Sequence, residues 1–296
     1  MPFVGDALLV IEVDDALVVF FGEKAHLLHV GDVYVADHKD GKTLAKLFLA
    51  GIAAENAIRE FRTSRVVYES GLPTPEPIRL ITDGTRFGAE YELIQPKRSF
   101  TRIISQEPDK LVPLSERFAV LAKQLHQTPA DTTRLPDMRE LASTWIDRLT
   151  DFPDDIKRRF HRFIDTVPST PTSLHGDLHI GNIITDGSRD LWIDVGDFAY
   201  GVPEWDLGMM YYGSHFLSAE RADNIFHLDN DTLRAHWDAF ATVYYGTDSR
   251  EALDAEVSKL QPFIATKMAF FISKLTDGKH PFSGPLLQMF DKYLPK

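Results

Sequence analysis

"SLHGDLHIGNIITDGSRDLWIDVGDFAYG", residues 173–201, places two histidines, an asparagine and several aspartates between apolar stretches that are typical of strands. Asp, Asn and Gly are ordinary residues of turns at strand ends. A turn alone does not explain why so many hard oxygen ligands occur together in one short segment. The segment therefore indicates a chemical site, and two kinds of chemistry fit its residues.

The first alternative is a hydrolase metal cluster formed by His175, Asp177 and His179. Neutral imidazoles and a carboxylate at alternate positions of the chain can converge on zinc or manganese. Such a site needs further ligands, for which the candidates are Asp194, Asp197 and His215.

The second alternative is phosphoryl transfer, which needs one carboxylate near the acceptor hydroxyl and hard oxygens for the magnesium ion on the nucleotide. His175-Gly176-Asp177-Leu178, followed by Asn182, matches the kinase catalytic loop H-x-D-L-x-x-x-N. Asp194-Val195-Gly196 is a Val-for-Phe version of the magnesium-binding D-F-G. A hairpin turn at Asp186-Gly187 is expected to return Asp194 toward Asn182, as two ligands of one ion require.

Three segments, "LHGDLHIGNIITDG", "WIDVGDFAYGVPEWDLG" and "LAKQLHQTP", resemble the aminoglycoside phosphotransferase and choline kinase superfamily. The resemblance covers most of the chain and is strongest over 119–127 and 173–208. It implies an α+β, bilobal, protein-kinase-like fold. In that fold a small antiparallel-sheet N-lobe carries one long helix, and the larger C-lobe is mainly α-helical.

The resemblance also implies roles for individual residues. Asp177 is expected to be the catalytic base, and Asn182 and Asp194 the magnesium ligands. Asp206 in "EWDLG" resembles the aspartate that braces the catalytic loop, although a carboxylate at a helix N-terminus is an equally good account of it. The resemblance also implies supporting roles for His175, His179 and Asp197. His179 is expected to have a structural role or to lie near the magnesium ion.

Lys46 in "KTLAKLFL" resembles the third-strand lysine that contacts the α- and β-phosphates of the nucleotide. Alternation places Lys46 on the same strand face as Leu44 and Phe48, and an inward lysine requires an anionic partner. Glu55 and Glu60 both lie on the helix that follows, about 140° apart around its axis, so they cannot both face Lys46. The resemblance favours Glu60, which lies where the helix of the family runs into a Leu-Pro-x-Pro turn, with Glu55 as the alternative.

The adenine is expected to lie against the strand "AEYELIQP", bonded by backbone groups of Glu92, Leu93 and Ile94. The phosphate loop departs from the family pattern because it lacks G-x-G-x-x-G. Gly22 and Gly31 are the only glycines of the segment in its place, "FFGEKAHLLHVGDVY". This departure keeps a nucleotide-binding regulator without turnover as an alternative to an active kinase.

Hydrophobic patterning divides the chain in the same way as the resemblance. Short strand-like runs and one helix over about 53–70 occupy the first part, where Asp83-Gly84 marks a hairpin. Amphipathic helices dominate after Pro96. We predict a nucleotide-binding lobe over 1–95 and a catalytic and acceptor-binding lobe over 96–296.

Composition excludes several protein classes. The 296 residues carry 32 Lys and Arg against 44 Asp and Glu, a formal charge of -12, which argues against a nucleic-acid surface. The chain has no cysteine, so it has neither disulfides nor thiolate chemistry. The first residues lack the basic region of a secretory signal peptide. No apolar run approaches the roughly 18 residues of a membrane span. We expect a cytoplasmic protein that binds neither nucleic acid nor membrane.

The sequence thus predicts a kinase that moves the γ-phosphate of ATP to a hydroxyl of an aminoglycoside-, amino alcohol- or sugar-like molecule, with Mg²⁺ as cofactor. GTP is the alternative donor, and we expect no obligate protein partner. The regulator without turnover and the metal-dependent hydrolase are the other functions to be tested.

Overall fold

The computed structural model describes residues 10–13, 16–20, 27–30, 33–37, 43–150, 152–275 and 284–296. The contacts between residues divide the chain into two compact units. The first combines Met1–Lys97 with Thr185–Asp197, and the second combines Arg98–Ile184 with Phe198–Lys296. The sequence placed the boundary after residue 95 and assigned residues 185–197 to the second lobe. The functions assigned to the two lobes stay predictions.

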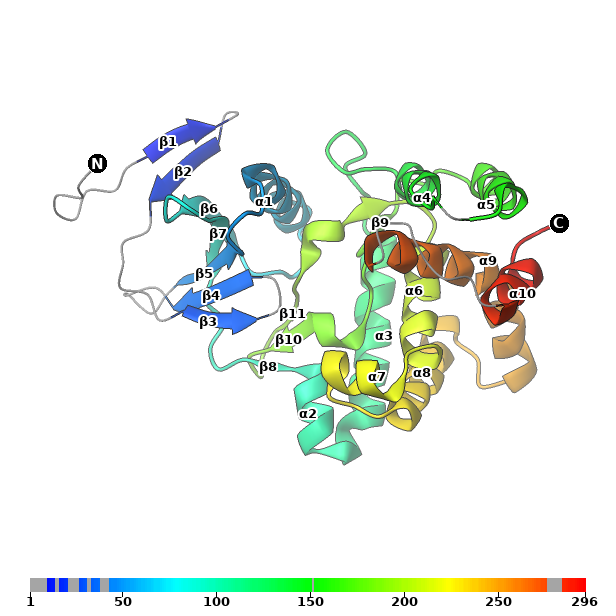
Figure 1. Cartoon of the computed structure of the whole chain (residues 1–296). Coiled ribbons are helices and arrows are strands. Elements are labelled where there is room, and N and C mark those ends of the chain that lie inside the picture. The colour runs from blue at the N-terminus through cyan, green and yellow to red at the C-terminus, as the bar shows by residue number, and fades with distance from the viewer. Residues whose placement is uncertain are drawn as a thin grey trace. The chain divides into compact units, whose positions relative to one another are not determined.

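A seven-stranded sheet in the order β1-β2-β6-β7-β5-β4-β3 forms the first unit (Figure 1). The pairing is antiparallel except between β2 and β6, which run parallel. The expected antiparallel sheet is therefore confirmed apart from this pair. Two parallel strands need a long crossover connection. Strands β3, β4 and β5 and a helix lie between β2 and β6 in the chain and provide it. The strands are β1 (Val10–Val13), β2 (Ala16–Phe20), β3 (Leu27–Val30), β4 (Val33–Asp37), β5 (Thr43–Phe48), β6 (Pro77–Thr82) and β7 (Phe87–Glu92).

Helix α1 (Ala54–Glu69) is the long helix expected over about 53–70, and it packs on the sheet at β6 and β7 (Figure 1). Ala57 and Ile58 of α1 are buried with Leu80 of β6, and Phe48 of β5 packs against them. The apolar face of an amphipathic helix thus holds α1 against the strand that contains Lys46.

Residues 185–197 belong to the first unit because they bond to the segment that follows α1. The amide of Trp192 in β11 (Asp190–Trp192) donates to the Pro73 carbonyl at 2.8 Å, and the Thr74 hydroxyl donates to the Trp192 carbonyl at 2.9 Å. The 3-10 turn η3 (Val195–Asp197) follows and lies against α1. These bonds fix the position of Asp194 within the first unit.

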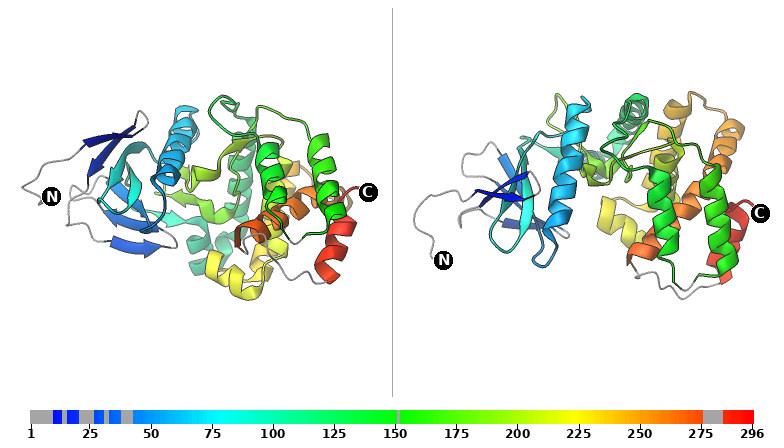
Figure 2. Two further views of the ribbon diagram at one scale, coloured as in Figure 1. Left: turned by 45° about the horizontal axis from the view of Figure 1, so that its top comes forward. Right: turned by 90° about the horizontal axis from the view of Figure 1, so that it is seen from above.

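The second unit is mainly helical, as expected. Helix α3 lies along α8, α6 lies along α8 and α9, and α4 lies beside α5 (Figure 2). The strands β9 and β12, at the start and the end of the motif segment 173–201, form an antiparallel pair. Within the described ranges, none of the helices combines the length and hydrophobicity that a bilayer span requires. The helices and short strands are β8 (Arg98–Ser99), α2 (Phe100–Gln106), η1 (Pro108–Lys110), α3 (Leu111–Gln127), α4 (Met138–Asp147), α5 (Asp154–Thr166), β9 (Ser173–Leu174), η2 (Ile180–Asn182), β10 (Ile183–Thr185), β12 (Ala199–Tyr200), α6 (Glu204–His215), α7 (Ala219–Phe226), α8 (Asn230–Tyr245), α9 (Arg250–Leu275) and α10 (Gly284–Tyr293).

Candidate functional site

The loop that joins β9 to η2 carries Asp177, and Asp206 of α6 fixes its backbone. The Asp206 carboxylate is 1% exposed and accepts bonds from the His175 amide at 2.7 Å and the Gly176 amide at 2.9 Å. Gly176 has a positive φ of 78°, a conformation that glycine adopts without strain. A buried carboxylate is costly unless it is fully hydrogen-bonded, so these bonds favour one conformation of the loop.

The sequence left two roles open for Asp206, a brace of the catalytic loop and a carboxylate at a helix N-terminus. The structure agrees with both, because Asp206 lies in the first turn of α6 and also bonds to the loop. His126, at the end of α3, makes the third bond to Asp206 through Nε2 at 3.1 Å. The other ring nitrogen of His126 bonds to the Tyr244 hydroxyl of α8 at 2.7 Å. The loop is thereby connected to three helices of the same unit.

Lys267 is a contact of the loop that the sequence reasoning did not identify. Its side chain is buried in the middle of α9, and Nζ donates to the Gly176 carbonyl at 2.8 Å. The ammonium group also lies 4.4 Å from the ring centroid of Phe270 and 5.5 Å from that of Trp145. One signal was present, namely a lysine within the apolar run "FIATKMAFF", because lysines are almost never buried without a partner.

The Asp177 carboxylate is accessible, with 34% of its side chain exposed, and the charges around it keep it ionised. Burial opposes ionisation of this carboxyl, but its interactions with His179, Lys267 and His175 outweigh burial and hold the pKa well below the usual range. His179 Nε2 lies 3.6 Å from Asp177 Oδ2. His179 Nδ1 accepts the Gly181 amide at 3.1 Å, so the proton of the neutral ring is on Nε2 and points to Asp177.

Asn182 lies at the end of η2 and is buried. Its amide nitrogen donates to the Asp177 carbonyl at 3.0 Å. Because that nitrogen is used within the loop, the side-chain oxygen of Asn182 is the atom that can ligate a metal ion.

Lys46 of β5 binds two carboxylates of the first unit. Its Nζ lies 2.8 Å from Glu60 Oε1 and 3.0 Å from Asp194 Oδ1. Burial alone would lower the pKa of Lys46, but Asp194 and Glu60 together raise it above its ordinary value, so the side chain stays cationic. Of the two glutamates considered, the structure places Glu60 against Lys46, whereas Glu55 is exposed at the start of α1.

Asp194 has a backbone φ of 54°, which is uncommon for a residue other than glycine. Its side chain is 58% exposed. Two residues later, Gly196 lies so close to Glu60 that a Cβ at this position would be 3.0 Å from Glu60 Cγ. Glycine at this position therefore allows the turn after Asp194 to approach α1, whereas Asp197 is exposed at the end of η3.

The residues expected at the adenine lie at the end of β7 and just after it. Glu92 is the last residue of β7, and its amide already donates to the Glu76 carbonyl at 2.9 Å. Leu93 and Ile94 follow, with Ile94 buried. Gly22 and Gly31 of the expected phosphate loop lie outside the described residues.

The three residues of the hydrolase alternative have different environments. His175 is fully buried with its ring 5.2 Å from that of Phe198, whereas Asp177 and His179 are partly exposed. Across the residues that the structure describes, no three His, Asp or Glu side chains are grouped so that they could hold one metal ion. The arrangement that the hydrolase needs is not found in that part of the chain.

Residues 30–241 match the model of the "Phosphotransferase enzyme family". The chain belongs to this family. The match includes the Asp177 loop, Lys46 and the turn at Asp194, and it confirms the relationship expected from the motifs. The protein is thus a phosphotransferase of the group that contains the small-molecule kinases. A search of curated proteins finds no significant match.

Solved structures confirm the fold. The ADP-bound aminoglycoside phosphotransferase APH(2'')-Ib is similar with a TM-score of 0.58 at 15% identity, over 92% of each chain. Amicoumacin kinase in complex with AMP-PNP, Ca²⁺ and Ami has a TM-score of 0.56 at 16% identity, over 93% of this chain and 87% of that one. An ethanolamine kinase from Plasmodium vivax has a TM-score of 0.55 at 13% identity, over 91% of this chain and 80% of that one.

Proposed function

We propose that this phosphotransferase moves the γ-phosphate of ATP to a hydroxyl group of a small molecule of the aminoglycoside, amino alcohol or sugar type. The observation that carries the proposal is an accessible Asp177 carboxylate in a loop whose backbone bonds to Asp206 and Lys267. GTP is the alternative donor. The kinases of similar fold that hold AMP-PNP or ADP support a nucleotide donor.

In this proposal Asp177 receives the hydrogen of the acceptor hydroxyl. A carboxylate with a lowered pKa is a weak base, so its main effect is to orient the hydroxyl toward the phosphorus and to take the proton as the new bond forms. Fixed backbone bonds at His175 and Gly176 reduce the reorganisation that accompanies this step.

Asn182 and Asp194 supply the oxygen ligands of Mg²⁺ in this proposal. The donor set fits this ion, because an amide oxygen and an exposed carboxylate are hard ligands. In the first unit, Asp194 and Glu60 both bond to the ammonium group of Lys46, and the Asp194 side chain stays 58% exposed and accessible to a cation. When bound, the ion neutralises charge on the phosphate oxygens.

Lys46 binds the α- and β-phosphates in this proposal, and Glu60 holds the ammonium group in place. Backbone groups of Glu92, Leu93 and Ile94 bond to the adenine, and the Glu92 amide is not among them because it already donates to the Glu76 carbonyl. This assignment makes Lys46 essential for nucleotide binding but not for acceptor binding.

The test compares Lys46→Ala and Asp194→Ala with the native protein in Mg-ATP binding and in phosphate transfer to a hydroxyl acceptor. We expect Lys46→Ala to weaken ATP binding and Asp194→Ala to lower the rate by several orders of magnitude. Near-normal turnover by Asp194→Ala would overturn the proposal. Hydrolysis of an ester that survives Lys46→Ala would favour the hydrolase, and ATP binding with no transfer to any acceptor would favour the regulator.

A further inference from the structure

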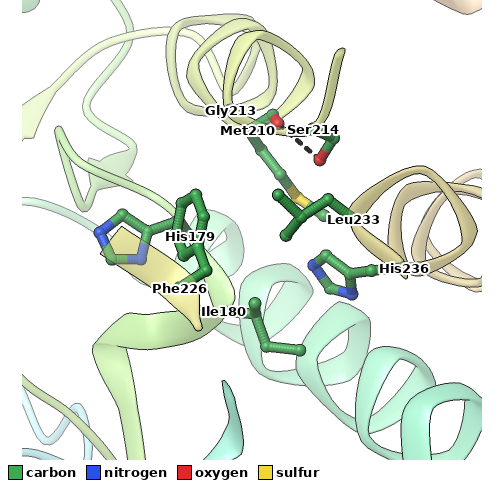
Figure 3. A pocket seen from close by; sticks show the side chains of 8 residues that line it. All are labelled: His179, Ile180, Met210, Gly213, Ser214, Phe226, Leu233 and His236. Atoms are coloured by element: carbon green, nitrogen blue, oxygen red, sulfur yellow. Dashed lines mark hydrogen bonds between the residues drawn. The ribbon is translucent and has the colours of Figure 1, made fainter. Parts of the chain in front are cut away.

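A small cavity lies behind His179, where α6, α7 and α8 pack against the loop that carries Asp177 (Figure 3). All its walls belong to the second unit, and its volume is about 10 Å³. This is the room that one water molecule needs. Phe226 and Leu233 are among the apolar side chains of the wall, whereas the ring of His236 points into the space (Figure 3). We call this space the His236 cavity.

His236 directs a hydrogen-bond acceptor into the cavity. The Ser115 hydroxyl donates to the Leu111 carbonyl at 2.6 Å, so it accepts the bond of 2.8 Å from His236 Nδ1–H. The proton of the neutral ring is therefore on Nδ1, and Nε2 carries a lone pair. His236 is 2% exposed, and no residue that the structure describes bonds to its Nε2. A buried acceptor without a donor is costly, so a molecule that brings its own hydrogen is expected beside it.

Ser214 of α6 supplies a second acceptor in the same wall. Its hydroxyl donates to the Met210 carbonyl at 3.0 Å, so its oxygen can accept a further bond. The ring of His179 has other partners, because its Nδ1 accepts the Gly181 amide and its Nε2 proton points to Asp177. His236 and Ser214 thus present two acceptors, which match the two hydrogens of one water molecule.

We propose that the His236 cavity binds one water molecule, which donates one hydrogen to His236 Nε2 and the other to Ser214 Oγ. Water fits the volume, supplies the donor that Nε2 needs and brings no charge among apolar side chains. Because Ser214 lies on α6 and His236 on α8, the water joins these two helices behind His179 and Ile180. It is part of the packing that supports the candidate catalytic loop, whichever acceptor or nucleotide the protein binds.

A crystal structure of the whole chain tests the site directly. At a resolution that shows ordered waters, we expect one density peak about 2.7–3.2 Å from both His236 Nε2 and Ser214 Oγ. A cavity without such a peak, a peak within this distance of only one of the two atoms, or a His236 ring turned so that Nε2 bonds to the protein would overturn the inference.

Gly213→Ala tests the water by displacing it. A Cβ at Gly213, in the wall of the cavity, would lie 3.8 Å from the ring of Phe226, an ordinary contact. Alanine favours a helix more than glycine does, so in a dry cavity this substitution should raise the unfolding temperature by about 2 °C. We expect no such gain, because the methyl group expels the water and leaves His236 Nε2 unpaired. A gain of this size in the native background would overturn the inference.

The same substitution in His236→Leu is the matched control, because that chain has no ring nitrogen to leave unpaired. There we expect Gly213→Ala to raise the unfolding temperature by about 2 °C. In His236→Gln, whose side-chain oxygen can accept the hydrogen of the water, we again expect no gain. An equal effect of Gly213→Ala in the native, His236→Leu and His236→Gln backgrounds would overturn the inference.

Discussion

Lys267 Nζ donates a 2.8 Å hydrogen bond to the carbonyl of Gly176, the residue that precedes Asp177. Helix α9 thus places a buried cation against the backbone of the candidate catalytic loop. The bond fixes one peptide group, and the charge of Lys267 is among the interactions that lower the pKa of Asp177. Lys267 is therefore a positioning residue, because it acts on the reaction through Asp177.

Replacing Lys267 with Met should lower kcat by about 10- to 100-fold, since the loop loses a charge-assisted bond and Asp177 loses a nearby cation. Steady-state kinetics measure this, with the KM for ATP expected to change little. Lys274→Met is the matched control, because Lys274 is exposed on the same helix and lies against Phe270. Equal kinetics for the two variants would refute the role of Lys267.

Asp206→Asn tests whether Asp206 braces the loop or only favours the N-terminus of α6. An amide in place of the carboxylate leaves at least one of its buried donors unpaired, which should destabilise the fold by about 1–3 kcal/mol and reduce kcat. Thermal unfolding and turnover are the measurements. Glu204→Gln removes a charge from the same first turn, so it reproduces the helix-terminus effect alone. If the two variants lose the same stability and activity, the bracing account is wrong.

Gly196→Ala should disturb the pair between Lys46 and Glu60. The added Cβ would lie 3.0 Å from Glu60 Cγ, closer than ordinary contacts, so the Glu60 side chain must shift by a few tenths of an ångström, which we expect to weaken its bond to Lys46. We expect the KM for ATP to rise by about tenfold, equivalent to about 1.4 kcal/mol. Adding the shorter Glu60→Asp in the same chain should recover part of the affinity. An unchanged KM in Gly196→Ala would show that the close approach has no effect on nucleotide binding.

Acid should destabilise the protein through His236. Burial is the main cause of lowering the pKa of His236 from 6.5 to about 3, with a smaller contribution from His179. The unfolded chain takes up a proton below pH 6.5 while the folded chain does not, so this contribution to stability is complete above pH 6.5 and decreases as the pH falls toward 3.

The expected slope from this one group is about 1.4 kcal/mol per pH unit. Urea unfolding at several pH values measures it, and His236→Leu should reduce the slope by that amount. The same slope in both proteins would mean that His236 takes up its proton in the folded state.

Local patterns predicted much of the fold and part of the surroundings of Lys46. Alternation along β5 indicated that Lys46 needs an anionic partner, and the helical period showed that Glu55 and Glu60 cannot both face it. The family resemblance favoured Glu60, which the structure places 2.8 Å from Lys46 Nζ. The helix α1 was predicted nearly to the residue because its buried face is continuous. The catalytic roles of Asp177, Asn182 and Asp194 stay predictions that rest on motif spacing.

Contacts between distant parts of the chain were not predictable in this way. Lys267 lies 91 positions from Gly176, and only the packing of α9 brings it to the loop. The same is true of His236 and Ser115, which come from α8 and α3. Residues 185–197 join the first unit through bonds of Trp192 to Pro73 and Thr74, and backbone bonds leave no trace in residue types.

Transfer of phosphate from γ-labelled ATP tests the central claim most directly. The native protein and Asp177→Asn are incubated with Mg²⁺ and a pooled panel of aminoglycosides, amino alcohols, sugars and nucleosides. We predict that label moves to one class of acceptor with the native protein and that Asp177→Asn, which binds ATP equally well, transfers it at least about 1,000-fold more slowly. Equal transfer by both proteins, or intact ATP in every pool with the native protein, would contradict the account.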